Sequence, residues 1–352
     1  MLNRNKNLVI VLISLTLTLL IGCFHPSPLN NNSTSPKSAN TEATYISRLE
    51  NAPNFALPID CNLGQDCFIM HYVDLEPSSE AVDFGCGRQT YDGHKGTDFG
   101  ISDLQIMNAG VPVLAAAKGT VLRVRDGIAD ELVDNSTKKQ AVKNIECGNG
   151  VVIDHGKGWE TQYCHLRQGS IVVKPDTKVE QGAVLGMVGA SGLASFPHVH
   201  LSIRKNGQII DPFVGANSTA GCNQPLNSLW SESLDYTPTG LIRAGFAPKP
   251  PTQTELWQGL YKDNQLSADI PTLIFWVHAY GVLQGDVEKW KLMAPNGQVV
   301  LNQDNVLDRS YRSWLSYTGK RTIVPGVWQG EYQLWRDRSL VFDVNTEVLV
   351  TN

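Results

Sequence analysis

The segments Gly93-His94-Lys95-Gly96-Thr97-Asp98-Phe99 and Pro197-His198-Val199-His200-Leu201 are the most informative stretches of this chain. In the first, a His and a carboxylate stand four residues apart. In the second, two His residues stand two apart, a spacing that puts both on the same face of a strand. Together the segments can supply three metal ligands and one further base. Three protein ligands with an open fourth position distinguish a catalytic zinc site from a structural one.

The chain around these segments is typical of β structure. Short apolar or alternating runs are separated by turn residues, and Gly156-Lys157-Gly158 lies between two of them, which predicts a hairpin. We therefore predict a mainly β fold with an antiparallel, barrel-like sheet over 84–213. The predicted strands are 111–116, 119–125, 151–155, 159–163, 171–173 and 184–189.

Residues 127–146 interrupt this pattern. They are rich in charged side chains and lack the alternation of a strand, which predicts a helical excursion between two strands. A solvated insertion is the simpler interpretation. A lid over a cleft is the alternative.

Length and composition restrict the class of protein. A chain of 352 residues with 42% hydrophobic and 18% charged residues can form two or three compact cores. The formal net charge is −5 and no run of Lys and Arg forms a basic stripe, so nucleic acid is not an expected partner.

The first residues have the composition of an export signal. Arg4 and Lys6 precede the uncharged, mostly apolar run 8–21. A transmembrane helix needs about twenty such residues, so this shorter run suits a signal peptide better. We predict a signal peptide over 1–22, against the alternative of an uncleaved anchor helix.

The end of this run predicts a lipid anchor. Leu20-Ile21-Gly22-Cys23 resembles a bacterial lipobox, in which cleavage precedes the Cys and its thiol is lipidated. Phe24 follows in place of Asp, which resembles outer-membrane sorting in Gram-negative lipoproteins. We therefore expect an exported protein, held in the membrane through lipidated Cys23, at the outer membrane and facing the periplasm.

The remaining cysteines predict disulfides. An even number of Cys in an exported chain is typical of a disulfide framework. Cys61 and Cys67 enclose a short loop and are expected to pair, whereas the other four allow three connectivities. A zinc knot is the weaker alternative because the chain has no CxxC pair. The disulfide candidates are Cys61, Cys67, Cys86, Cys147, Cys164 and Cys222.

Beyond the central region, five prolines mark residues 222–252 as a linker. The strands expected after it suit a β-sandwich of immunoglobulin type. Six of the eight Trp residues lie there, as core residues or, alternatively, as a glycan-binding platform. The predicted segments are 1–22 signal peptide, 23–50 tether, 51–83 lead-in, 84–221 catalytic domain, 222–252 linker and 253–352 sandwich.

Residues 82–213 resemble the M23 family of zinc metallopeptidases (lysostaphin/LytM-like), which cut peptidoglycan. The family's motifs occur here in the same order. They are Gly93–Phe99, Gly110–Val121, Tyr163-Cys164-His165-Leu166, Val179–Gly182 with Gly186–Gly189, Pro197–Leu201, and Asn206-Gly207 with Asp211-Pro212.

The resemblance implies a role for individual residues. His94, Asp98 and His200 match the family's zinc ligands, with one Zn²⁺ per chain, and His165 and His198 match its catalytic His pair. Zinc polarises a carbonyl and lowers the pKa of water, while the imidazoles move protons or stabilise the oxyanion. Cys164 beside His165 departs from the usual family pattern, and we expect a disulfide there that stiffens the strand of His165. The remaining His residues are predicted to be structural: His25, His71, His155 and His278.

Ser202 departs from the family's pattern, which more often has an acidic residue at this position. Strand alternation puts it on the face of His198 and His200, one step beyond the metal, without an expected role in the chemistry. Ser191 lacks the Gly two residues later that a nucleophile elbow requires.

Three functions remain open at this point. The first is a zinc endopeptidase that hydrolyses peptide cross-links of peptidoglycan, with the D-alanyl–diaminopimelate bond expected in a Gram-negative host. The second is a catalytically inactive LytM-like lipoprotein that binds and activates a cell-wall amidase, a wall-associated protein partner. The third is a scaffold whose C-terminal sandwich binds glycan or a partner. In addition, residues 51–83 or 127–146 could cover the cleft.

Overall fold

The computed structural model describes residues 52–216 and 220–352. The predicted signal peptide 1–22, the lipidation candidate Cys23, the tether 23–50 and His25 lie outside the described residues. Within the described part, no helix combines the length and the apolar character needed to cross a membrane.

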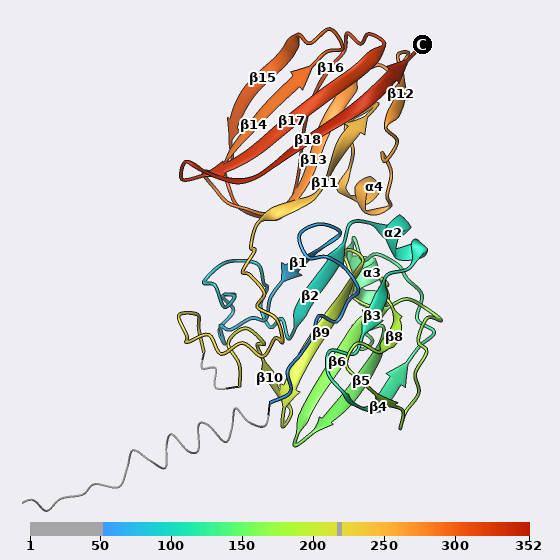
Figure 1. The fold of residues 1–352 in the computed structure, drawn as a ribbon, viewed down its shortest axis with the longest axis vertical. Coiled ribbons are helices and arrows are strands. Elements are labelled where there is room, and N and C mark those ends of the chain that lie inside the picture. The colour runs from blue at the N-terminus through green and yellow to red at the C-terminus, as the bar shows by residue number, and fades with distance from the viewer. Residues whose placement is uncertain (1–51, 217–219) are drawn as a thin grey trace, which may run out of the picture. The chain divides into compact units, whose positions relative to one another are not determined.

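Strands make up most of the regular structure, which confirms the mainly β prediction (Figure 1). The helices are α2 Leu104–Ala109, α3 Ser136–Ala141 and α4 Gln253–Trp257. The strands before residue 220 are β1 Cys67–His71, β2 Thr97–Ile101, β3 Pro112–Leu114, β4 Gly119–Arg125, β5 Asn149–Gly156, β6 Trp159–Leu166, β7 Lys178–Val179, β8 Val184–Met187, β9 His198–Lys205 and β10 Gln208–Ile210. The later strands are β11 Gly240–Ala247, β12 Gln265–Ser267, β13 Leu273–Val282, β14 Val287–Met293, β15 Val299–Val306, β16 Tyr311–Lys320, β17 Gly326–Arg336 and β18 Ser339–Thr351.

One antiparallel sheet organises the first half of the described chain. Its strand order is β1-β2-β9-β6-β5-β4-β7, with β10 paired to β9. In neighbouring strands Val151 pairs with Tyr163 and Tyr163 with Leu201, and all three are almost completely buried. Because successive side chains of a strand alternate between faces, the residues next to these three project from the opposite face. The apolar face thus builds the core, and the other face carries the polar side chains.

The described cysteines form three disulfides: Cys61–Cys67, Cys86–Cys222 and Cys147–Cys164. The predicted Cys61–Cys67 pair is confirmed, and the connectivity of the other four is now assigned. The Cys147–Cys164 bond joins the residue just after the 127–146 excursion to β6, the strand of His165, as expected for Cys164.

The structure corrects two details of the strand and linker predictions. Residues 171–173 form no strand, since Val172 is 68% exposed and the segment contacts β8 through the Val172 N–H and Leu185 carbonyl. Within the predicted linker 222–252, residues 240–247 form β11, which pairs with β13. Apolar residues such as Phe246 account for this strand despite the neighbouring prolines, because they pack into the core of the C-terminal sheets.

The C-terminal strands form two sheets, β11-β13-β16 and β12-β18-β17-β14-β15. Their apolar faces meet in one core, where the Phe275 and Trp290 rings lie 5.2 Å apart. Trp276, Trp290 and Trp328 are each at most 2% exposed, which confirms the core interpretation for these three tryptophans. The immunoglobulin-type topology stays a prediction.

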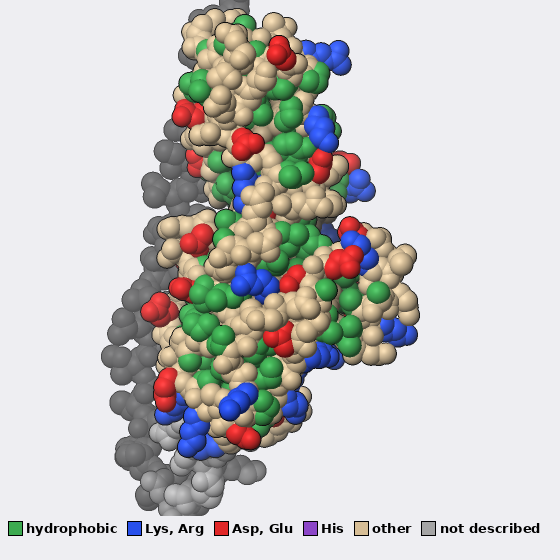
Figure 2. Space-filling model, turned by 90° about the vertical axis from the view of Figure 1, so that its right-hand side faces the viewer, with side chains coloured by type: hydrophobic (Ala, Val, Ile, Leu, Met, Phe, Trp, Pro, Cys, Tyr) green, Lys and Arg blue, Asp and Glu red, His purple; other side chains and the backbone are tan. Residues whose placement is uncertain are grey.

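On the face shown in Figure 2, basic and acidic side chains are interspersed.

Asp211 is a buried carboxyl in the turn that follows β10. Its Oδ1 accepts hydrogen bonds from the Phe213 and Val214 N–H groups, at 2.7 and 3.2 Å, whereas its buried Oδ2 has no partner in the described chain. Burial raises the pKa of Asp211 to about 7, and the hydrogen bonds oppose that rise only in part. The unfolded chain has a carboxyl pKa of about 3.9. Because the folded pKa is the higher one, this group favours folding at low pH, and that contribution is lost as the pH rises through about 7.

We therefore expect the Asp211→Asn variant to gain stability over the parent as the pH increases. Between pH 5 and pH 8 the difference in unfolding free energy should shift by roughly 2–3 kcal/mol in favour of the variant. Urea unfolding of both proteins at the two pH values measures this shift. If the difference in unfolding free energy is the same at both pH values, ionisation of Asp211 does not destabilise the folded protein.

Candidate metal centre and active site

Four adjacent strands bring the site residues together. In the register of β1, β2, β9 and β6, His71 is opposite Asp98, Asp98 opposite His200, and His200 opposite Cys164. His94 lies in the loop just before β2. The predicted ligands His94, Asp98 and His200 are thus neighbours in space, as the resemblance implied.

The donor atoms of these three residues are spaced as metal ligands are. His94 Nε2 lies 3.2 Å from Asp98 Oδ1 and 3.1 Å from His200 Nδ1, and the last two atoms are 2.8 Å apart. Ligand atoms around zinc, with bonds of about 2.0–2.1 Å, lie roughly 3.3 Å from one another in a tetrahedron. A side chain at position 96 would disturb this arrangement, because a Cβ on Gly96 would be 2.5 Å from His200 Nε2. These residues could therefore hold a metal ion, with a fourth position left for water or substrate.

In His94 and His200, the ring nitrogen that faces away from the centre also has a hydrogen-bond partner. His94 Nδ1 donates a hydrogen bond to the Tyr72 carbonyl at 2.6 Å, and His200 Nε2 lies 3.0 Å from Ser202 Oγ. Such partners fix the tautomer and orientation of a ligand imidazole. Ser202, for which we expected no role, thus contacts a candidate ligand directly.

His71 contacts Asp98 Oδ2, the oxygen of the carboxylate that does not face the other two candidate ligands. This contact is contrary to the purely structural role that we predicted for His71. Its Nδ1 lies 2.9 Å from Asp98 Oδ2, so a neutral His71 donates to the carboxylate oxygen that faces away from His94 and His200. Burial lowers the pKa of His71 although Asp98 opposes the shift, which keeps the ring neutral at neutral pH. The sequence offered only one signal for this residue, its position at the end of an apolar run (Phe68–Met70) that can form a strand.

We expect His71→Ala to weaken metal binding roughly 10–100-fold, the usual cost of removing a hydrogen-bond partner of a ligand. Competition with a chromophoric chelator measures the affinity without relying on activity. His71→Asn keeps an N–H near the position of Nδ1 and should retain most of the affinity. His155→Ala is the control, because His155 bonds to Lys118 and Thr161 away from the centre. Equal affinity of the His71→Ala variant and the parent would contradict the role.

The carboxylate dominates the electrostatics of the centre. Burial alone would raise the pKa of Asp98, but the imidazoles of His94 and His198 and the hydrogen bonds from His200 and His71 hold it well below the usual range. Burial lowers the pKa of His94, yet the attraction of Asp98 outweighs it and leaves a net rise. The centre is thus built around one buried negative charge that a cation can balance.

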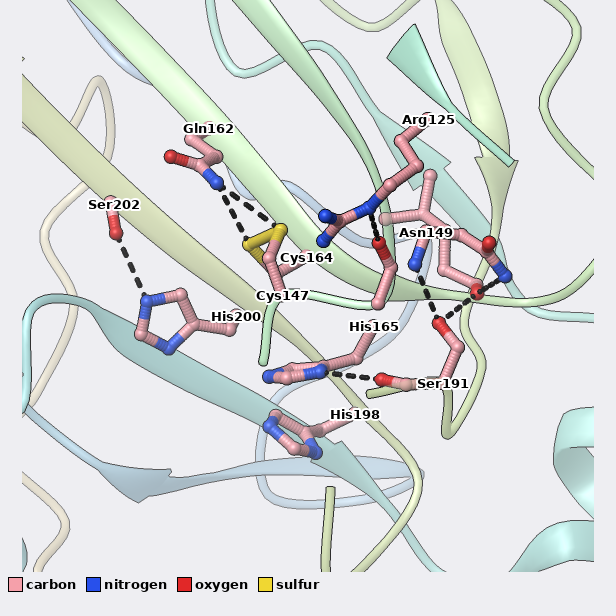
Figure 3. The surroundings of a disulfide bond; sticks show 12 residues. Arg125, Cys147, Asn149, Gln162, Cys164, His165, Ser191, His198, His200 and Ser202 are labelled. Atoms are coloured by element: carbon pink, nitrogen blue, oxygen red, sulfur yellow. Dashed lines mark hydrogen bonds between the residues drawn. A yellow bond between two sulfur atoms is a disulfide. The ribbon is translucent and has the colours of Figure 1, made fainter. Parts of the chain in front are cut away.

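The two predicted catalytic histidines lie beside the centre and touch each other. The His165 and His198 rings are 4.6 Å apart, centroid to centroid (Figure 3). His165 Nδ1 donates to the Ser191 carbonyl and His198 Nδ1 to the Phe196 carbonyl, both at 2.8 Å. With Nδ1 protonated, each neutral ring keeps a lone pair on Nε2, and that of His198 lies 3.6 Å from Asp98 Oδ1.

Both rings are neutral at physiological pH. Burial, reinforced by the nearby His198 and His200, holds the pKa of His165 well below its usual range. Burial lowers the pKa of His198 to about 4, although Asp98 opposes the shift. Two neutral imidazoles beside a metal centre can accept a proton and pass it on.

His165 is held in a left-handed backbone conformation, with φ of +63°. Such a conformation is costly for a residue other than Gly and persists only where the surroundings enforce it. The His165 N–H donates to the Cys147 carbonyl at 2.8 Å, and the Cys147–Cys164 disulfide joins the same two segments (Figure 3). The disulfide therefore helps to aim His165.

A cavity of about 200 Å³ lies on this face, and both His165 and His200 line it. Its other lining residues include Tyr91, Leu193 and Arg204. Among the described residues, none from 52–83 lines it, and the 127–146 excursion contributes only its last residue, Glu146. The excursion contains the short helix α3 and borders the cavity at its edge.

Two further histidines lie apart from the metal donors. His155 bonds to the Lys118 carbonyl and to Thr161, and His278 bonds to Ser313. Ser191 is buried, donates to the Leu166 carbonyl and accepts from the Asn149 N–H. These contacts account for the three residues as structural, in agreement with the sequence-based expectation.

Comparisons with known proteins match this region. Residues 92–212 match the model of Peptidase family M23. A Haemophilus influenzae protein called an uncharacterized metalloprotease is 30% identical over 119 residues, which is 34% of this chain and 20% of the relative. The Neisseria meningitidis DD-carboxypeptidase/endopeptidase Mpg is 36% identical over 98 residues, or 28% of this chain and 20% of the relative. The Vibrio cholerae peptidoglycan DD-endopeptidase ShyA is 30% identical over 118 residues, which is 34% of this chain and 22% of the relative.

The matched part spans about a fifth of the length of these relatives. Among solved structures, a zinc-containing peptidase from Vibrio cholerae has a TM-score of 0.27 at 24% identity, covering 41% of this chain and 39% of the other. The catalytic domain of lysostaphin from Staphylococcus simulans has a TM-score of 0.26 at 21% identity, covering 40% of this chain and 85% of the other. The sequence match encloses all three candidate ligands and the His pair. Residues 92–212 of this chain are a peptidase family M23 domain.

Proposed function

We propose that this chain is a zinc-dependent endopeptidase that hydrolyses peptide cross-links of peptidoglycan. One observation carries the proposal. Three donor atoms converge at metal-ligand spacing, and two neutral imidazoles with free Nε2 lone pairs lie beside them. The names of two relatives, a DD-carboxypeptidase/endopeptidase and a peptidoglycan DD-endopeptidase, support the choice of substrate.

In this proposal His94, Asp98 and His200 hold one Zn²⁺. Zinc in such a site polarises the scissile carbonyl and lowers the pKa of water towards about 7. One imidazole of the His165–His198 pair takes a proton on its Nε2 and later returns it to the departing amine. While it carries this proton, the imidazolium also stabilises the negative charge that develops on the carbonyl oxygen. The backbone carbonyls of Ser191 and Phe196 keep both rings in the tautomer that these steps require.

The test is digestion of purified, cross-linked muropeptides by the full chain in detergent, with mass spectrometry of the products. We expect cleavage at the peptide cross-link, with the D-alanyl–diaminopimelate bond as the first candidate. Activity should disappear after dialysis against a chelator and return with stoichiometric Zn²⁺. Protein that binds zinc and leaves every cross-link intact would contradict the proposal.

The alternative, an inactive amidase activator, does not suit this site. An inactive relative of a metallopeptidase needs neither a metal-ligand set nor a proton-transfer pair. All five predicted positions are present here, and their contacts orient them for those two tasks.

We also propose that the chain is exported and anchored at the outer membrane through lipidated Cys23. The lipobox-like sequence and the three disulfides support this location, because disulfides form in the oxidising periplasm rather than in the cytosol. Metabolic labelling with a fatty acid analogue should mark the chain and leave Cys23→Ala unmarked. Labelling of that variant would contradict the anchor.

A further inference from the structure

Three arginines lie on the same face of the sheet as the metal centre. In the register of the strands, Arg123 is opposite Val152, Val152 opposite Gln162, and Gln162 opposite Ser202. This row runs next to the row of Asp98, His200 and Cys164. Arg125 and Arg204 project from the same face, each two residues along its strand from a member of the Arg123 row.

Two adjoining cavities, together called the groove, lie between these arginines and the catalytic residues. Arg123 and Arg125 line a cavity of about 370 Å³. That cavity and the 200 Å³ cavity at His165 and His200 share Glu146, Cys147 and Gln162 as lining residues. Figure 3 shows Arg125 and Gln162 near the Cys147–Cys164 disulfide, with the histidines beyond it. The disulfide and Gln162 therefore form the floor between the two ends.

Gln162 is held between the two ends of the groove. Its Nε2 donates to both sulfurs, at 3.1 Å from Cys147 and 3.3 Å from Cys164, and its Oε1 accepts a hydrogen bond from Arg204. This contact holds the Arg204 guanidinium over the groove, whereas the Arg125 Nε is held by the Gly148 carbonyl.

No close ion pair among the described residues holds these arginines, although Glu146 lines both cavities and attracts Arg125, and Glu160 is opposite Arg204 on the neighbouring strand. In the described part of the chain, no Asp or Glu oxygen lies within 4.0 Å of a side-chain nitrogen of Arg123, Arg125 or Arg204. Burial, together with the positive charge of Arg123, lowers the pKa of Arg204, although Glu160 opposes the shift. Like charges placed together on a groove wall create a site that an anion would stabilise.

We propose that Arg123, Arg125 and Arg204 form a subsite for a free carboxylate of the peptide that the catalytic centre cuts. Guanidinium groups bind carboxylates through paired, charge-assisted hydrogen bonds, and arginine is the residue best shaped for this. The inference rests on the proposed endopeptidase function and specifies its substrate class. The enzyme would prefer peptide stems with an unmodified side-chain or terminal carboxylate over amidated stems.

The distances suit a peptide bound across the strands. Arg123 lies on β4, three strands from His200 on β9, and strands are spaced by about 4.8 Å. The Arg123 and Arg125 end of the subsite is therefore roughly 14 Å from the metal centre, a span of about four residues of extended peptide. Arg204, in contrast, lies on β9 with His200 and lines the cavity at the metal centre. The carboxylate would thus belong to a residue some way along the stem, beyond the two that flank the cleaved bond.

The experiment compares two cross-linked muropeptide dimers, one with free carboxylates and one with the same groups converted to carboxamides. The parent, Arg123→Gln, Arg204→Gln and the double variant are assayed as full chains loaded with zinc. Loss of charge-assisted hydrogen bonds should lower kcat/KM on the free-acid dimer roughly 10–100-fold, mostly through KM. On the amidated dimer the variants and the parent should agree.

Two controls separate the subsite from general effects. Arg309→Gln removes the same charge from an exposed side chain in the loop between β15 and β16 and should change neither substrate's rate. Arg123→Lys keeps the positive charge and should restore part of the preference. Equal losses on both dimers, or none on either, would overturn the subsite.

A binding measurement keeps this test independent of the proposed function. Fluorescently labelled monomeric stem peptides, free acid and amidated, are titrated with the zinc-loaded parent and variants. The parent should bind the free acid at least 10-fold more tightly, and the double variant should lose this difference. If neither dimer is cleaved but this binding preference is found, the endopeptidase function fails and the subsite stands. Equal affinity for the two peptides would overturn the subsite itself.

Discussion

Alanine at His165 or at His198 is expected to lower kcat on cross-linked muropeptides by roughly 10²–10⁴-fold while the protein still binds zinc. Neither ring belongs to the three donors at metal-ligand spacing, so the metal centre should survive both changes. What is lost is the group that accepts a proton on Nε2 or stabilises the oxyanion. Because the two rings act on one reaction, the kcat of the double variant should be only slightly lower than that of the less active single variant.

Three measurements check this prediction together. The rate gives the catalytic loss, metal analysis gives the zinc content, and circular dichroism reports the fold. His155→Ala is the matched control, since it removes an imidazole held by Lys118 and Thr161 and should keep full activity. A His165→Ala or His198→Ala protein with full zinc and unchanged kcat would rule out the assigned roles.

Asp98→Ala is expected to weaken zinc binding by about 3–5 kcal/mol, the usual loss when one member of a buried ion pair is removed. That corresponds to a factor of roughly 10²–10⁴ in the dissociation constant. Asp98 is 2% exposed and supplies the only carboxylate among the described donors at the centre. The two remaining imidazoles are neutral ligands and cannot balance a divalent cation in a buried site. Hydrolysis should disappear with the metal.

Chelator competition on the apo proteins measures this affinity directly. Asp98→Asn keeps an oxygen near the position of Oδ1 without its charge, so its affinity should lie between those of the parent and Asp98→Ala. Millimolar zinc should restore part of the activity of Asp98→Asn. If Asp98→Ala retains stoichiometric zinc through dialysis, another residue must supply the third ligand.

The two predictions test different links between structure and activity. The His pair concerns chemistry with the metal in place, whereas Asp98 concerns whether the metal binds at all. The His71 substitution is an intermediate case, because it should lower the affinity for the metal while leaving all three candidate ligands present.

The candidate ligand set and the candidate catalytic pair could be predicted from the sequence and its family resemblance. The order and spacing of the motifs around His94, Asp98, His165 and His198–His200 were sufficient, and strand alternation put positions 198, 200 and 202 on one face. Local patterns also predicted β4, the β5–β6 hairpin and the Cys61–Cys67 pair. These features depend on residues close together in the chain, which is why they can be predicted from it.

Which distant residues meet depends on the three-dimensional fold. The β1–β2 register brings His71 to Asp98, although 27 residues separate them. The β4–β5–β6–β9 registers align Arg123 with Gln162 and Ser202, and the fold selects Cys86–Cys222 and Cys147–Cys164 from three possible connectivities. A shift of one residue in any of these pairings would turn the side chains to the other face. Burial of the apolar face across all of the strands sets that register, and no local stretch of sequence contains this information.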